Sequence, residues 1–168
     1  YNSMTSRLLV DKIEGKSTAN TVQMPEGSVI QVVQGTLYGI VNFTATSMTA
    51  SGLSVNITPK FSTSKMLVTC TFVSDLSAGG RQMYATLYRD STRLDTQTAL
   101  GGNASSNGLH TNYSTARIIF DGSMQFLDLP STSSTITYEA YAKSVTGGTV
   151  SFNAQNCLGR IIVEEVAQ

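Results

Sequence analysis

The stretch ITYEAYAKSVTGGTVSF, residues 136–152, decides the fold class of this chain. Apolar side chains occupy every second position from 136 to 142, with more polar side chains between them. This period of two is typical of a β-strand that buries one face. Gly147 and Gly148 then predict a tight turn, and we expect residues 150–152 to return beside the first strand.

The same pattern continues on both sides of this stretch. We expect further strands at residues 29–33, 53–57, 66–73, 83–88, 93–98, 116–120, 124–127 and 160–166. Asp121 and Gly122 predict a two-residue hairpin between two of them. Short strands separated by turn signals favour a sandwich or a barrel, and eight strands in two sheets make a jelly roll. The sequence therefore predicts an all-β jelly-roll sandwich of about eight to ten strands.

Charge is scarce in this chain. Only 13% of its 168 residues are charged and the formal net charge is zero, about half the usual charged fraction. A protein that binds nucleic acid through its phosphates needs a positive surface, so we expect no nucleic-acid partner. No apolar run is long enough to predict membrane insertion.

Nothing in the spacing of the ligand-type side chains predicts a metal or a cofactor. Cys70 and Cys157 lie far apart in the sequence, and neither has a second cysteine or a histidine at ligand spacing. The aspartates are spread over different turns, without the spacing of a calcium loop. We expect no metal and no cofactor, and the sequence leaves open whether an ion lies on a symmetry axis and whether the two cysteines pair.

Catalytic residues are also hard to nominate. His110 is the only histidine, and no G-x-S-x-G nucleophile motif is present. Glu164 and Glu165 are adjacent on a predicted strand, so their side chains point to opposite faces. A hydrolase of polysaccharides is the enzymatic alternative, but it needs two facing carboxylates, and no such pair can be nominated. We expect that the protein is not an enzyme.

The chain divides into two parts. Residues 1–27 are too few to bury a core of their own, yet they carry an apolar cluster, so we predict an N-terminal attachment arm. The cluster consists of Leu8, Leu9, Val10 and Ile13. Residues 28–168 are the predicted sandwich.

One long irregular stretch interrupts the strands, at residues 99–114. Loops of this length in compact domains are usually functional or mobile. Its Asn, Ser, Gly and Tyr residues resemble the adaptable composition of antibody paratopes and also suit glycan hydroxyls. The two interpretations are a recognition loop and a loop under little constraint. The candidate binding residues are Asn103, Asn107, His110, Asn112 and Tyr113.

Several phrases of the sequence occur in a familiar order: MPEGSVIQVVQ (residues 24–34), TASGLSVNITPKFSTSKMLVTCTF (49–72), MQFLDLPSTSSTITYEAYAKS (124–144) and RIIVEEVAQ (160–168). Together they resemble the phage tail-fibre and virion structural proteins of marine and cyanobacterial phages. The resemblance covers most of the chain. It implies a trimeric jelly-roll head similar to those of tumour necrosis factor and complement C1q.

Two functions follow as hypotheses. In the first, the chain is a structural component of a bacteriophage virion, a homotrimeric knob that decorates the capsid or forms part of a fibre. Its partners would be copies of itself and other virion proteins of the capsid or tail. In the second, it is a receptor-binding tip that recognises a host-surface glycan or protein through residues 99–114. Aromatic area for an interface would come from Tyr84, Tyr88, Tyr138 and Tyr141, although tyrosines on an ordinary sheet surface explain the pattern equally well.

Overall fold

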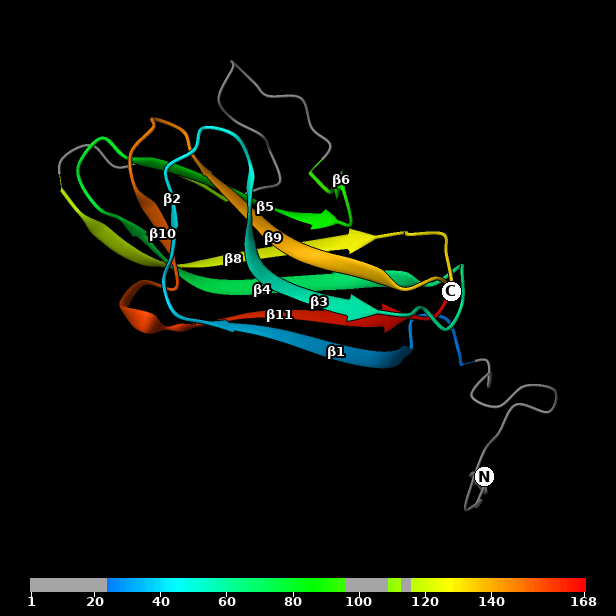
Figure 1. Cartoon of the computed structure of the whole chain (residues 1–168). Coiled ribbons are helices and arrows are strands. Elements are labelled where there is room, and N and C mark those ends of the chain that lie inside the picture. The colour runs from blue at the N-terminus through cyan, green and yellow to red at the C-terminus, as the bar shows by residue number, and fades with distance from the viewer. Residues whose placement is uncertain (1–23, 96–108, 113–115) are drawn as a thin grey trace, which may run out of the picture.

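The computed structural model describes residues 24–95, 109–112 and 116–168, and these residues form a sandwich of two antiparallel sheets (Figure 1). The strands are β1 (Val29–Tyr38), β2 (Val41–Phe43), β3 (Thr49–Ile57), β4 (Lys65–Leu76), β5 (Gln82–Arg89), β6 (Thr92–Arg93), β7 (Leu109–Asn112), β8 (Ile118–Asp128), β9 (Ile136–Ser144), β10 (Val150–Phe152) and β11 (Leu158–Val166), with a 3-10 turn η1 (Ala154–Asn156) before the last.

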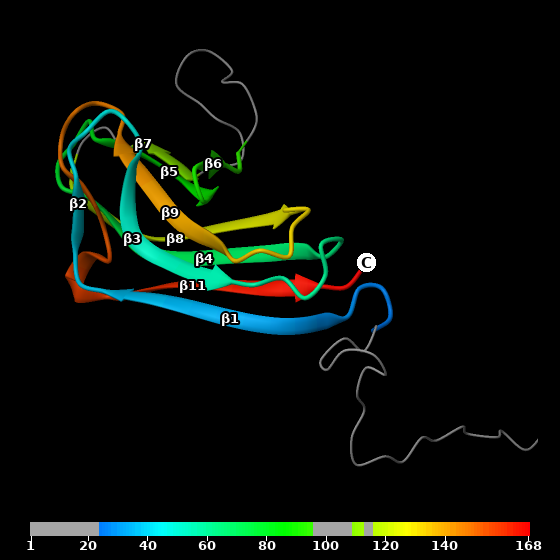
Figure 2. The same ribbon diagram turned by 45° about the vertical axis from the view of Figure 1, so that its right-hand side comes forward.

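Strand β4 organises the first sheet, which we call sheet A. It pairs with β8 along one side and with β11 and β10 on the other, while β1 pairs with β11 and β2 with β10. The second sheet, sheet B, has the order β3-β9-β5, and β6 and β7 both pair with the far side of β5. Figure 2 shows β1, β11, β4 and β8 running side by side, with β2 and β10 at one end of that sheet.

The pairings are nested, as in a long hairpin wrapped around itself. β1 pairs with β11, β3 with β9, β4 with β8, and β5 with β7, all antiparallel. Eight strands arranged in this way over two packed sheets make a jelly roll. The predicted all-β jelly-roll sandwich is therefore confirmed.

Two local predictions were wrong. Asp121 and Gly122 form no hairpin, because β8 continues through them and pairs with β4 over its whole length. The inward side chains stay in phase across Gly122, which lies opposite Phe72, so that an aromatic ring can cover the glycine of an edge strand. Strand β10 does not return to β9 either, since the chain crosses after Ser144 into sheet A.

The core lies between the two sheets. Met66, Val68, Cys70 and Phe72 point into it from β4 and are almost completely buried. The ring of Phe72 stacks on that of Phe152, with 3.9 Å between the ring centroids. Both cysteines are free thiols. Burial raises the pKa of Cys70 to about 12, because the apolar core disfavours the thiolate.

One acidic side chain in this interior fixes a loop to sheet A. Glu165 points inward from β11 and is fully buried. Its carboxylate accepts hydrogen bonds from the backbone amides of Lys60 and Phe61, at 2.8 and 3.2 Å, and from the side-chain amide of Gln31. The connection between β3 and β4 is thereby held against β11 and β1.

The two sheets approach each other very closely at Gly35 on β1. A Cβ atom at this position would lie 1.9 Å from the backbone oxygen of Ser54 on β3, far inside van der Waals contact. Only a residue without a side chain allows β1 to pass β3 at this distance.

We therefore expect that Gly35→Ala destabilises the fold, at the upper end of the range of about 1–3 kcal/mol seen for overpacked interiors. Urea unfolding followed by circular dichroism measures the change. Thr36→Ala, one position along on the exposed side of β1, is the control and should cost less than about 1 kcal/mol. Equal stability of Gly35→Ala and the unmodified protein would contradict the described approach of β1 and β3.

Candidate functional site

Most of the predicted site residues lie outside the part of the chain that the structure describes. This holds for the arm residues Leu8, Leu9, Val10 and Ile13 and for Asn103, Asn107 and Tyr113 of the predicted loop. His110 and Asn112 lie in β7, where their backbones pair with Tyr84 and Gln82. The predicted loop at 99–114 therefore contains a strand, and its recognition role is untested.

The four tyrosines proposed for an interface have different environments. Tyr84 is 1% exposed and Tyr138 is fully buried, so neither offers interface area, and for these two the interpretation was wrong. Tyr88 and Tyr141 are half-buried on the outer face of sheet B and stack on each other, with 4.1 Å between their ring centroids. One face of each ring is thus occupied by the other ring.

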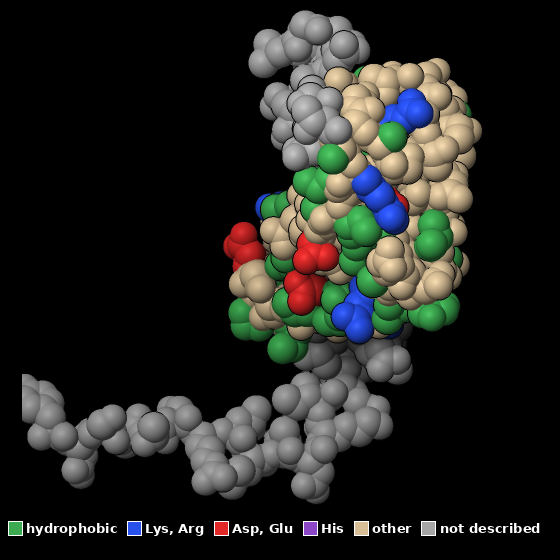
Figure 3. Space-filling model, turned by 90° about the vertical axis from the view of Figure 1, so that its left-hand side faces the viewer, with side chains coloured by type: hydrophobic (Ala, Val, Ile, Leu, Met, Phe, Trp, Pro, Cys, Tyr) green, Lys and Arg blue, Asp and Glu red, His purple; other side chains and the backbone are tan. Residues whose placement is uncertain are grey.

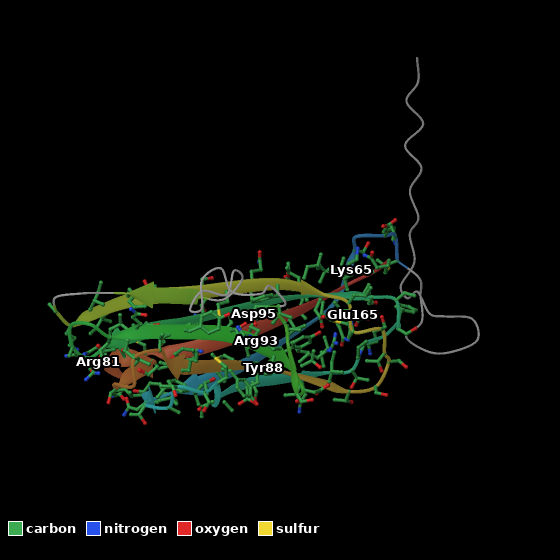
Figure 4. The ribbon with its side chains drawn as sticks, turned by 90° about the horizontal axis from the view of Figure 1, so that it is seen from above. Lys65, Arg81, Tyr88, Arg93, Asp95 and Glu165 are labelled. Carbon is green, nitrogen blue, oxygen red and sulfur yellow. The ribbon has the colours of Figure 1, made fainter. Side chains whose placement is uncertain are left out.

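Tyr84 is buried on the outer face of sheet B, and charged groups lie beside it. The Arg93 guanidinium donates a hydrogen bond to its hydroxyl at 2.8 Å and also pairs with Asp95, which is 4% exposed. The Lys143 ammonium lies 5.9 Å from the ring centroid of Tyr84, within cation–π range. Arg93 and Asp95 lie together near the middle of the sandwich in Figure 4. These contacts hold β6 and the residues directly after it against β5.

A second polar group joins the two sheets inside the sandwich. Arg89 of β5 donates to both carboxylate oxygens of Asp128 at 2.7 and 2.8 Å, and the Tyr138 hydroxyl donates to the same carboxylate at 2.6 Å. Burial, with the hydrogen bond to Asp128, raises the pKa of Tyr138 far above its ordinary value, since ionisation would place a second anion beside the carboxylate. The group has the geometry of a structural bridge between sheets.

The outer face of sheet A carries exposed apolar side chains on four neighbouring strands. Leu67 of β4 lies directly opposite Leu127 of β8, while Ile162 and Val166 of β11 are its diagonal neighbours. Val32 of β1 is paired with Glu164 of β11, and Glu164 is in turn paired with Leu67. Val32 and Leu127 are 57% and 62% exposed, and the other three are half-buried. We call these five residues the outer patch.

Two charged side chains belong to this surface. Glu164 lies between Val32 and Leu67 in the register, and Lys65 is paired with Val166 at the margin of the patch. Neither side chain makes an ion pair with any residue of the described part of the chain. Figure 4 places Lys65 at the same end of the sandwich as Glu165, opposite Arg81. An exposed apolar patch bordered by polar and charged side chains is typical of a surface that meets a partner.

The end of the sandwich near β2 and β10 offers less. Its surface mixes charged, hydrophobic and other side chains (Figure 3). A shallow hollow of about 240 Å³ lies between β4, β8 and the start of β11, and Asp121 is its only charged lining residue. Among the described residues we find no cluster of three or more metal-ligating side chains and no helix that could cross a membrane.

Comparison with known proteins adds little to this geometry. No protein-family model matches the sequence, and no curated protein is similar enough to count as a match. Among solved structures, one similar chain belongs to the infectious bursal disease virus, Gx strain, with 16% sequence identity and a TM-score of 0.38. The alignment covers 84% of this chain but only 39% of that one, so the present chain spans well under half of its length.

The bridge formed by Tyr138 predicts a specific alkaline sensitivity. Because the folded-state pKa of Tyr138 lies above its ordinary value of about 10, its stabilising effect is complete below pH 10 and is lost as the pH rises further. At pH 8, Tyr138→Phe should lower the free energy of unfolding by about 1.5–3 kcal/mol.

Between pH 10 and pH 11, the stability difference between the two proteins should shrink by about 1 kcal/mol, as measured by urea titration at each pH. Tyr38→Phe removes a hydroxyl from a side chain that is 75% exposed and is the matched control. A stability difference that stays constant through pH 11 would contradict the interpretation.

Proposed function

We propose that this chain is a structural module of a virion, non-enzymatic and assembled as a homotrimer through contacts between its copies. The observation that carries the proposal is the outer patch. A single copy leaves Val32 and Leu127 more than half exposed, next to three further aliphatic side chains. Association would remove this surface from water.

Three further observations support a role in an assembly. The chain has zero formal net charge and only 13% charged residues, which leaves a solitary copy poorly protected against association. The carboxylates of Glu165 and Asp128 accept hydrogen bonds that join segments of the fold, which supports a structural role for them and not a catalytic one. The sequence phrases quoted above resemble phage virion proteins, and this resemblance supports the bacteriophage source, the trimer and the location in a capsid or tail.

The alternative is a receptor-binding tip that recognises a host-surface glycan or protein through residues 99–114. One feature favours it: Leu109–Asn112 is hydrogen-bonded to β5, so part of this segment is anchored on a rigid sheet. Replacing residues 99–108 by a short glycine-containing turn should then abolish adsorption of assembled particles to host cells. Unchanged adsorption would exclude this alternative and leave the structural role in place.

The assembly itself is testable by light scattering of the full chain at micromolar concentration. We expect a mass three times the 17.9 kDa of one chain. Leu127→Asp should reduce that mass to a single copy, because a carboxylate in the outer patch cannot be buried without a partner. Gln125→Asp introduces the same charge on the same face of β8 but outside the patch, and should leave the trimer intact. A monodisperse monomer of the unmodified chain would overturn the proposal.

A further inference from the structure

The start of β1 lies beside the outer patch. Ser28 donates a backbone hydrogen bond to Pro25 at 3.0 Å, and Gly27 has a φ of +85°, which together make a tight turn just before the strand. The amide of Gly27 donates to the carbonyl of Ala167 at 2.9 Å. The residues that precede the sandwich therefore enter next to Val166, which belongs to the outer patch.

The length of chain beyond this point is sufficient to reach the patch of the same copy or of an adjacent one. The ten residues 14–23 separate the apolar cluster of the arm from Met24. When extended, they span up to about 33–36 Å. The patch extends over four neighbouring strands, a width of about 15 Å. Reach therefore does not limit where the cluster can bind.

The chemistry of the arm complements that of the patch. Leu8, Leu9, Val10 and Ile13 supply aliphatic side chains for an aliphatic surface. They are interleaved with Asp11 and Lys12 and followed by Glu14, so the segment carries both signs of charge. The surface around the patch likewise carries one charge of each sign, on Glu164 and Lys65, and neither is ion-paired with any residue that the structure describes. A segment with this pattern can cover the apolar side chains and pair both charges.

We propose that residues 8–13 of one copy bind to the outer patch of a neighbouring copy, so that exchanged arms hold the assembly together. The inference rests on the proposed function, because it takes contacts between copies as given. It adds the partner of the outer patch, which is the N-terminal segment of this same chain.

Two full-length variants test the exchange. Leu9→Asp with Ile13→Asp disables the arm and leaves the patch intact, while Leu127→Asp disables the patch and leaves the arm intact. Ser17→Asp with Thr18→Asp adds the same charge to the polar part of the arm and is the control. We expect each disabled variant to be a monomer by sedimentation velocity and the control to be a trimer. An equimolar mixture of the two disabled variants should form a dimer, because an intact arm meets an intact patch in the other copy.

Other outcomes separate the inference from the proposed function. A trimer of the arm variant would overturn the inference while the assembly stands. Two monomers that do not combine on mixing would also overturn it, because the arm would then bind within its own copy or elsewhere. A monomeric unmodified chain would overturn both. Circular dichroism checks that each variant folds. If Leu127→Asp does not fold, Val32→Asp on β1 is used in its place to disable the patch.

Discussion

The buried carboxylate of Glu165 connects three segments that are distant in the sequence. It accepts two backbone amides from the β3–β4 connection and the side-chain amide of Gln31, which also donates to the carbonyl of Thr58 at 2.8 Å. None of these donors is a charged side chain, so amide N–H groups alone make these hydrogen bonds to the carboxylate. Because Glu165 and Glu164 are adjacent on a strand, fixing the first inward also fixes the second outward. The composition of the outer patch follows from this choice of register.

Alternation predicted the fold class well because most strands of this sandwich have one buried and one exposed face. Ile136 to Ala142 is the clearest example, with inward side chains at every even position. The prediction failed at Asp121 and Gly122, where a local turn preference was given more weight than the phase of the alternation. It also failed at Val150, because nothing local to that segment indicates which sheet it joins. Long-range pairing decided both cases.

The candidate surface was harder to predict than the fold. Leu67 and Val32 are apolar residues at outward positions of their strands, and this out-of-phase signal is readable in the sequence. Their proximity to Leu127 depends on the order β1-β11-β4-β8, which no single strand specifies. The tyrosines show the opposite error, since Tyr84 faces outward from sheet B and is nevertheless buried, with Arg93 hydrogen-bonded to its hydroxyl. Side-chain type alone cannot distinguish these two situations.

The nesting of the strands also constrains when the fold can form in the cell. Among the described strands, β1 pairs only with β11, which lies between β1 and β4, so β1 cannot join the sheet before β11 has been synthesised. Paired residues of the two strands, such as Val33 and Val163, are about 130 positions apart. At typical rates of translation, on the order of ten seconds passes between the synthesis of the two strands. During that interval β1 has no strand to pair with and exposes its valines to whatever is nearby. A chaperone, or a second nascent chain on the same messenger RNA, would encounter it in this state.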